Sequence, residues 1–361
     1  MPLTLAIVGS GSLARATCLA ISIAAPPDTA GMTVVLLARD GAAAARIAHV
    51  SGVRAALSGR SVRFTAVPVD PTDPAALGDA LAALAPDGVL VCASTQSPWE
   101  PIDRPSAWTA LMGRAGFGLT LPFQAQVALA VGAAVRRSSP AAFIVNACFP
   151  DAVNPLLVAC QVPVAAGVGN VGILAAALQA ALGLPDQRRL HVIGHHLHLH
   201  APADPRDEAM VWLDGERLDD VAGLLAAHRA AGDGRGNNDI TGLLAARLVL
   251  ALLTGAGEDT HLPGVEGLPG GYPVRITAGE VALRLPPGVV REQAVAANRR
   301  WATRDGALVD GGRVLFGPAV TEALAPLLPA YADGFAASEV TEVIAALQAL
   351  RERLRSQPVT S

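Results

Sequence analysis

A glycine-rich turn near the N-terminus has the spacing that binds the pyrophosphate of a dinucleotide. The motif G-S-G-S-L-A begins at residue 9, follows the apolar run 3–8, which predicts a buried strand, and opens a predicted helix. Gly9 would permit the sharp turn, Gly11 would let a phosphate approach the backbone, and Ala14 would keep the helix close to the sheet. A purely structural turn is the alternative. The residues expected to contact the cofactor are Gly9, Ser10, Gly11, Ser12 and Leu13.

The residues after the next predicted strand indicate which dinucleotide the turn would accept. The apolar run 33–37 is followed by Ala38, Arg39 and Asp40. A carboxylate at this point binds the 2′-hydroxyl of the adenine ribose in NAD, whereas an arginine can pair with the 2′-phosphate of NADP. Arg39 favours NADP, and Asp40 keeps NAD open. Ser94, which follows a further predicted strand, is also expected at the cofactor.

Histidines are concentrated in one short segment of the second half of the chain. Five of the eight histidines lie between residues 191 and 200, in and before the run G-H-H-L-H-L-H. If this run is a strand, His196, His198 and His200 share one face, where they could bind zinc, and His195 lies on the other. One catalytic histidine is the favoured interpretation. A solvated strand edge and a metal site are the alternatives, and with no further ligand motif nearby we expect no metal.

The order of these motifs resembles that of the lactate/malate dehydrogenase-like superfamily, which also includes the NAD-dependent family 4 glycosidases. The run S-S-P-A-A-F-I-V-N-A resembles the family strand that ends in an asparagine contacting substrate and nicotinamide, here Asn146. The run G-L-P-D-Q-R-R-L-H-V-I-G-H-H resembles the segment leading to the catalytic histidine, here His196, with His195 as the alternative. The resemblance implies a Rossmann domain followed by an α+β domain.

Two further stretches carry the same resemblance toward the C-terminus. The run G-N-N-D-I-T-G-L-L-A-A-R resembles the family helix that presents a threonine to the substrate, here Thr241. Asn237 and Asn238 are expected on the same wall of the cleft. The runs P-G-G-Y-P-V-R-I and D-G-G-R-V-L-F resemble the C-terminal antiparallel sheet of the family.

Two positions depart from the family and change the expected substrate. The family pairs its histidine with an aspartate and binds the substrate carboxylate with an arginine three residues later. Counted back from Gly183, these positions are Asn170 and Ile173. Asparagine does not stabilise an imidazolium as a carboxylate does, and isoleucine does not bind a carboxylate. Asn146 and Asn170 would then orient substrate and nicotinamide by hydrogen bonds, and a simple 2-hydroxy acid is not the expected substrate.

The segment 94–119 corresponds to the mobile loop of the family and is longer here. Its two tryptophans and Phe117 predict a larger, less polar substrate. Arg104 and Arg114 are candidates for substrate binding, although a solvated arginine is the commoner case on such a loop.

Composition excludes several other classes of protein. The chain has 361 residues, and its 27 basic residues, all arginine, and 31 acidic residues give a net charge of −4. Without lysine it has neither a Schiff-base lysine nor a P-loop. Without a basic run it has no electrostatic footprint for nucleic acid or an anionic membrane. We therefore expect a small-molecule substrate as partner and, from the resemblance, a homo-oligomer.

Three further features bear on location. The four cysteines lie in apolar segments without a C-x-x-C pair and are expected to be reduced core thiols. The N-terminus lacks the charged start of a signal peptide. The uncharged segment 116–135 contains a proline and two glutamines, which favours a loop and a buried helix over a membrane span. A cytoplasmic protein is expected.

The elements that must position these residues follow two patterns. Residues 1–160 alternate apolar strands with alanine-rich helices, which predicts a doubly wound α/β parallel sheet of Rossmann type. Residues 161–361 predict an α+β substrate domain with antiparallel strands. That antiparallel set is expected at 272–277, 280–285 and 313–316, before a last helix at 337–356.

The function predicted from these features is an NAD(P)-dependent oxidoreductase, with NADP(H) favoured. A hydride would pass between nicotinamide and a carbonyl or imine carbon, and His196 would transfer the proton. A nicotinamide-binding sensor or scaffold without redox turnover is one alternative, motivated by the missing aspartate and arginine. A redox-neutral, glycosidase-like enzyme is the other, although residues 167–170 lack the cysteine and histidine of the G-x-C-H metal pattern.

Overall fold

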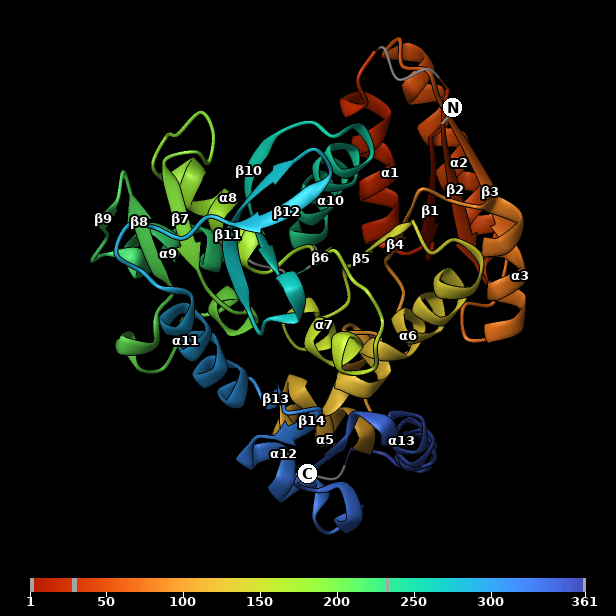
Figure 1. Ribbon diagram of the computed structural model, residues 1–361. Helices are drawn as coiled ribbons and strands as arrows, with labels where there is room; N and C mark the ends of the chain where they lie inside the picture. Colours follow the sequence, from red (N-terminus) through yellow and green to blue (C-terminus); the bar gives the residue numbers. More distant parts are fainter. Residues whose placement is uncertain (1–2, 28–30, 232–233, 235, 360–361) are drawn as a thin grey trace.

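A six-stranded parallel sheet forms the centre of the N-terminal half of the computed structural model, which describes residues 3–27, 31–231, 234 and 236–359 (Figure 1). The strand order is β3-β2-β1-β4-β5-β6, which is the Rossmann order and confirms the predicted fold class. The strands are β1 (Thr4–Val8), β2 (Met32–Ala38), β3 (Val62–Pro68), β4 (Gly88–Val91), β5 (Phe143–Asn146) and β6 (Ala166–Gly167).

Helices cover both faces of this sheet. One face carries α1 (Ser12–Ala24), α2 (Gly41–Leu57) and α10 (Gly236–Thr254), whose apolar side chains share a core with the strands. Helices α1 and α10 pack closely because residue 242 is glycine: a Cβ there would lie 2.4 Å from that of Ala16. The other face carries α3 (Pro74–Leu84), α6 (Leu121–Ser138) and α7 (Pro150–Ala159).

Helix α6 corresponds to the uncharged segment noted in the sequence. The stretch Phe117–Ser138 is long and apolar enough to cross a membrane, but 78% of its most apolar window is buried inside the protein. The helix packs against α3 and the C-terminal helix in the larger of the apolar cores. The expected buried helix is therefore present, and the residues before it form a 3₁₀-helix, η1 (Phe117–Thr120), where a loop was expected.

Antiparallel sheets of three strands each form the rest of the molecule, as predicted for the C-terminal half. They are β7 (Leu190–Ile193), β8 (Met210–Leu213) and β9 (Glu216–Arg217); β10 (Glu258–Pro263), β11 (Gly271–Thr277) and β12 (Glu280–Leu283); and β13 (Ala307–Asp310), β14 (Arg313–Phe316) and β15 (Gly334–Ala336). The expected grouping of residues 313–316 with 272–285 is wrong, because β14 pairs with β13 and β15 instead.

The remaining helices connect these sheets to the parallel sheet. They are α4 (Glu100–Asp103), α5 (Ala107–Ala115), α8 (Val171–Ala181), α9 (Val221–Ala231), α11 (Arg291–Arg304), α12 (Pro318–Leu324), α13 (Val340–Arg355) and the 3₁₀-helices η2 (His196–Leu199), η3 (Pro205–Asp207), η4 (Val265–Gly267), η5 (Pro329–Tyr331) and η6 (Ala337–Glu339).

Two features of the packing connect the parts of the chain on either side of residue 160, where a domain boundary is expected from the sequence. Strand β6 pairs with β5, so the parallel sheet extends beyond residue 160. The segment from β13 to α13 returns to the N-terminal half, where its apolar side chains share a core with α5, α6 and α7 (Figure 1). Residues near the C-terminus thereby come to lie at the edge of the parallel sheet, which matters for the site described next.

Candidate active site

The glycine turn lies at the carboxyl end of β1, beside β4, where the strand order reverses. Gly9 has φ +128°, and a Cβ there would lie 3.2 Å from the carbonyl carbon and oxygen of Cys92, so only glycine fits without strain. A Cβ on Gly11 would meet no atom within 4 Å. Helix α1 begins at Ser12 without a side-chain cap, which leaves its first amide groups for an anion.

A cleft of about 1220 Å³ runs along this edge of the sheet. Its wall includes five of the residues expected at the cofactor and one expected at the substrate, together with the C-terminal helix α13. The expected residues that line it are Gly9, Ser10, Arg39, Asp40, Ser94 and Arg104. A crevice at the switch point of a parallel sheet is where such folds bind nucleotides, so the expected residues and the expected place agree.

Arg39 and Asp40, the two residues that follow β2, make different contacts. The side chain of Asp40 caps helix α2 by accepting a hydrogen bond of 2.8 Å from the amide of Ala43. Arg39 is exposed and lines the cleft. It lies near Asp70, whose pKa is lowered chiefly by hydrogen bonds from Thr72 and to a smaller degree by Arg39. The carboxylate is thus turned toward its own helix, and the guanidinium is turned toward the cleft.

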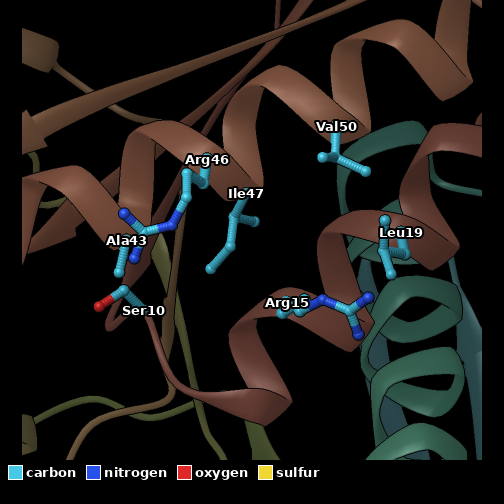
Figure 2. A pocket seen from close by; sticks show the side chains of 7 residues that line it. All are labelled: Ser10, Arg15, Leu19, Ala43, Arg46, Ile47 and Val50. Carbon is cyan, nitrogen blue, oxygen red and sulfur yellow. The ribbon is translucent and has the colours of Figure 1, made fainter.

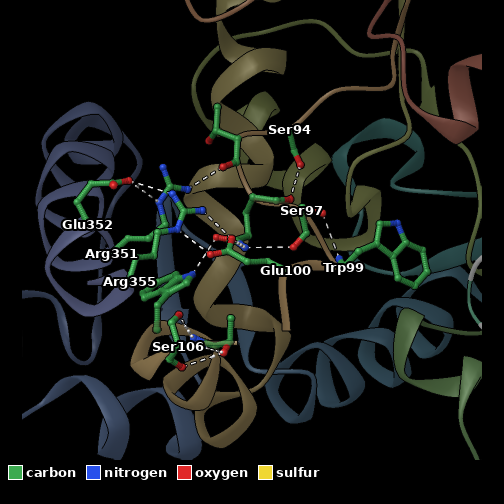
Figure 3. A network of polar contacts seen from close by, with 12 residues as sticks. Ser94, Ser97, Trp99, Glu100, Ser106, Arg351, Glu352 and Arg355 are labelled. Carbon is green, nitrogen blue, oxygen red and sulfur yellow. Dashed lines mark hydrogen bonds and ion pairs between the residues drawn. The ribbon is translucent and has the colours of Figure 1, made fainter. Parts of the chain in front are cut away.

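A buried carboxylate ties the segment after β4 to helix α13 (Figure 3). Glu100 accepts hydrogen bonds of 2.7 and 2.6 Å from the guanidinium of Arg355 and one of 2.7 Å from Gln96. The other end of the Gln96 amide accepts a hydrogen bond from the buried indole of Trp108. Burial raises the pKa of Glu100, but the hydrogen bonds from Arg355 and Gln96 outweigh it and hold that pKa below its usual value.

Arg351 makes a second link between α13 and the same segment. Its Nη1 donates to the carbonyl of Thr95 at 2.7 Å, and its guanidinium carbon lies 4.1 Å from the ring centre of Phe123. Arg351 is 6% exposed and lines the cleft. The C-terminal helix therefore forms a wall of the cleft, which the sequence did not predict.

The histidine segment is not a strand, so the expected face of three imidazoles is not formed. Residues His196–Leu199 form the 3₁₀-helix η2. His198 is engaged at both nitrogens: Nδ1 accepts from the amide of His195, and Nε2 donates to the carbonyl of Asp207 at 2.7 Å. Burial lowers the pKa of His198 to about 3. Among the residues that the structure describes, no group of three or more His, Cys, Asp or Glu side chains could hold a metal ion.

His196 is paired with a carboxylate that the sequence analysis did not identify. Its Nδ1 lies 3.0 and 3.2 Å from the two carboxylate oxygens of Asp305, which follows helix α11. Burial lowers the pKa of His196, but the charge and hydrogen bond of Asp305 outweigh it and raise that pKa above its usual value. Burial likewise raises the pKa of Asp305, and His196 brings it below its usual value. The pair leaves Nε2 of His196 to exchange a proton with a substrate.

Asn170 and Asp151 hold the backbone of this histidine, not its ring. The fully buried Asp151 accepts a hydrogen bond of 3.0 Å from the amide of His196 at one oxygen. Its other oxygen accepts a hydrogen bond from the side chain of Asn170. Asn170 occupies the position expected to face the histidine ring, and the structure corrects that expectation: Asn170 acts on His196 through Asp151.

Two aromatic rings pack against His196. Phe117 stacks on His196 with ring centres 4.7 Å apart and an interplanar angle of 25°, and Phe149 meets it edge-on at 5.3 Å. The side chain of His196 is 22% exposed, whereas that of His195 is fully buried. The alternative His195 therefore has no access to a substrate in this structure, although its Nδ1 lies 3.5 Å from Asp305.

The remaining expected residues lie in three different places. Asn146 is buried at the end of β5, where its amide shapes the turn by bonding both backbone groups of Cys148 and the side chain of Asn154. Asn238 donates to the hydroxyl of Ser12 at 2.7 Å, so it supports the glycine turn and not a substrate wall. The positions of the others follow: Leu13 is partly buried in α1, Thr241 is buried beside Gly169, Asn237 is partly buried, and Arg114 is exposed on α5.

One continuous segment connects the cofactor cleft to the histidine. Residues from Ser94 to Ser106 line the cleft, and Phe117, farther along the same segment, stacks on His196. His196 is not among the described residues that line the cleft. At the end near Phe117, the segment approaches the residue after Asp305 closely because both positions are glycine. A Cβ on Gly118 would lie 2.3 Å from the carbonyl carbon of Gly306.

Comparison with known proteins was informative only at the level of structure. No protein-family model and no curated protein sequence matches the chain. The malate dehydrogenase from Salinibacter ruber matches with a TM-score of 0.54 and 14% identity, over 97% of this chain and 99% of that one. The lactate dehydrogenase from Eimeria maxima, solved with NADH and oxamate, matches with a TM-score of 0.53 and 16% identity, over 84% of this chain and 93% of that one.

A third solved structure supports the same conclusion. The malate dehydrogenase from Archaeoglobus fulgidus, solved in complex with NADH, matches with a TM-score of 0.52 and 16% identity, over 84% of this chain and 97% of that one. At these identities the likeness concerns the fold, and it confirms at that level the resemblance drawn from the sequence motifs. The chain therefore has the fold of the lactate and malate dehydrogenases.

Proposed function

We propose that the protein is an NAD(P)-dependent oxidoreductase that transfers a hydride between nicotinamide and a carbonyl or imine carbon. The observation that carries the proposal is the juxtaposition made by residues 94–120. One end of this segment lines a dinucleotide-type cleft, and the other covers a histidine paired with a carboxylate. The NADH-bound dehydrogenases with the same fold support a nicotinamide cofactor.

The residues present fit such a cofactor. The open space beside Gly11 and the uncapped start of α1 would take the pyrophosphate, and Arg39, Asp40 and Ser94 would border the rest of it. When bound, the nicotinamide supplies or accepts the hydride. The protein supplies the anion site, the orientation and the proton.

His196 would transfer that proton at Nε2. In the reducing direction the imidazolium donates to the carbonyl oxygen or imine nitrogen, and Asp305 stabilises the cation that precedes the transfer. The raised pKa of His196 favours the protonated form near neutral pH. In the oxidising direction the neutral imidazole accepts the proton from the hydroxyl or amine.

We further propose a substrate that is larger and less polar than a simple 2-hydroxy acid. Ile173 stands where a carboxylate-binding arginine was expected, and it is 3% exposed within the protein. The rings beside His196 are those of Phe117 and Phe149. Neither an isoleucine nor a phenylalanine ring pairs with a carboxylate, and the two phenylalanine rings would pack well against an apolar substrate.

The direct test of the proposal starts with the cofactor. NADPH and NADH are titrated separately into the protein, and energy transfer from its tryptophans is followed. Saturable binding of at least one cofactor, followed by its oxidation in the presence of members of a carbonyl and imine panel, is the expected result. Absence of binding for both would remove the proposal.

One observation favours a nicotinamide-binding protein without turnover as the second candidate. Phe117 stacks directly on His196 and limits the exposure of that side chain to 22%. If the ring stays in place when cofactor is bound, no substrate reaches Nε2. Cofactor binding without turnover on the whole panel, in both wild type and Phe117→Ala, would select this candidate.

A further inference from the structure

A groove between helices α1 and α2 begins at Ser10, in the glycine turn (Figure 2). Its cavity volume is about 340 Å³, and it extends along the helices to Val50. Ser10 also lines the cofactor cleft, so the groove and the cleft share this residue as a common wall. A ligand in the cleft can therefore extend a group past Ser10 toward the groove.

Arg46 is placed at this shared end of the groove. Figure 2 shows its guanidinium directed toward Ser10 and Ala43, whereas the guanidinium of Arg15 is directed away, toward α10. Within the described part of the chain, Arg46 forms no ion pair and its side chain makes no hydrogen bond. Its charge is therefore not used by the fold.

Arg39 lines the cleft together with Ser10. Arg39, like Arg46, has no carboxylate partner within salt-bridge distance among the described residues. The nearest acidic neighbour along the chain, Asp40, is held by its cap on α2. Arg39 thus lines the cleft, Arg46 lines the groove, and both spaces border Ser10.

We infer that Ser10, Arg39 and Arg46 form a subsite for a phosphate monoester on the adenine ribose, the 2′-phosphate of NADP(H). This inference rests on the proposed function. It adds Arg46 and the groove to Arg39, the arginine that the sequence pattern assigns to the 2′-phosphate. A doubly charged phosphate accepts several charge-assisted hydrogen bonds, and guanidinium groups supply them in fork geometry. The free 2′-hydroxyl of NAD uses neither arginine.

The test uses two small probes that need no substrate. Adenosine 5′-monophosphate (AMP) and adenosine 2′,5′-bisphosphate (2′,5′-ADP) are titrated calorimetrically into the full-length protein, because they differ only in the 2′-phosphate. Wild type is expected to bind 2′,5′-ADP at least about tenfold more tightly than AMP, and Arg46→Ala is expected to lose about tenfold for 2′,5′-ADP alone. Arg46→Glu should reverse the preference, because it places a negative charge at the phosphate.

Arg15→Ala is the matched control. It removes an arginine from the same groove, but one directed away from Ser10, so both affinities should stay at the wild-type values. Unchanged AMP binding in every variant shows that the fold and the cleft are intact. Equal affinity of wild type for both probes, with no effect of Arg46→Ala, would overturn the subsite and leave the proposed function standing. Absence of binding for both probes would remove the nicotinamide site itself.

Discussion

The cofactor cleft and the histidine pocket are built in opposite ways. The cleft is open, and its wall includes Gly9 and Ser10 of the glycine turn, which the uncapped start of α1 follows directly. The pocket is closed, and its carboxylate and its histidine are 109 residues apart in the chain. The cleft would bind its ligand through backbone groups that are already accessible. The histidine pocket would act through side chains that buried contacts hold in place.

This difference separates the two regions in how they respond to substitution. At an exposed position of the cleft, such as Arg39, a change alters the space or charge available to the ligand, and the fold has little to lose. In the pocket, Asp151 and Asp305 are hydrogen-bonded to His196, so a change at one of these residues leaves a buried partner without its hydrogen bond. The four predictions below use this contrast, from the largest expected effect to the smallest.

Replacement of the catalytic candidate should separate turnover from binding. His196→Ala removes the group that exchanges the proton, so turnover is expected to fall by about 10²–10⁴-fold, while the dissociation constant of the cofactor stays unchanged. Steady-state kinetics on a substrate from the panel and a cofactor titration measure the two quantities. His200→Ala, an exposed neighbour in the same segment, is the control. Retained turnover in His196→Ala would assign the proton to another group.

Neutralising the carboxylate partner should change the pH dependence. Asp305→Asn removes the charge that raises the pKa of His196, so the pKa observed by NMR of labelled histidine is expected to fall. The same change should lower the free energy of unfolding by about 1.5–3 kcal/mol, because a buried charge-assisted hydrogen bond is lost.

The stability difference should itself depend on pH. The raised pKa of His196 stabilises the fold below the ordinary histidine pKa, and this contribution is lost as pH rises through the raised value. The lowered pKa of Asp305 stabilises the fold above the ordinary aspartate pKa, and this contribution is lost as pH falls. Urea denaturation should therefore show the largest gap between wild type and Asp305→Asn at about pH 4–6.5. A gap independent of pH would contradict the ion pair.

Substitution of the two glycines of the turn should affect different properties, stability at Gly9 and cofactor affinity at Gly11. Gly9→Ala places a Cβ against the backbone of Cys92 at φ +128°, so it should destabilise the fold by about 1–3 kcal/mol. Gly11→Ala meets no protein atom and has an allowed φ of −77°, so its stability should match wild type while its cofactor affinity falls. Denaturation and titration of both variants make the comparison. Full cofactor affinity in Gly11→Ala would place the pyrophosphate elsewhere.

The smallest effect is expected at the link between α4 and α13. Arg355→Met removes an ion pair whose arginine is 33% exposed, and Glu100 keeps the hydrogen bond from Gln96. A loss of about 1 kcal/mol is expected, together with weaker cofactor binding if α13 shapes the cleft. The control is Arg353→Met, on the same helix. Equal effects of the two variants would show that the link to Glu100 has no special role.

How far the sequence predicts this molecule can be judged at particular residues. The apolar run of β1 and the turn after it were predictable, because a buried parallel strand and a glycine turn leave patterns within a few residues. The histidine run could not be assigned from its pattern, because H-x-H-x-H alternates with period two and is therefore compatible with a strand. In the structure its backbone instead follows the contacts of Asp151 and His198, which lie outside that pattern.

Asp305 shows what no local pattern could reveal. It occupies a T-R-D-G turn after a helix, which has the composition of a solvated loop. Its carboxylate lies 3.0 Å from Nδ1 of His196, beside the close contact between Gly118 and Gly306, which are far apart in the chain. Asp151 could have been noticed as an acidic residue within the apolar run after β5. Its hydrogen-bond partners could not be identified from the sequence.

The sequence alone determined the parallel sheet, the glycine turn and the arginine beside it, because each depends on residues that are neighbours in the chain. Tertiary structure alone decided which carboxylate pairs with His196, that Asn170 acts through Asp151, and that helix α13 forms a wall of the cleft. Those choices depend on which surfaces are buried together. Burial joins residues more than a hundred positions apart, and it sets their pKa values only after the chain has folded.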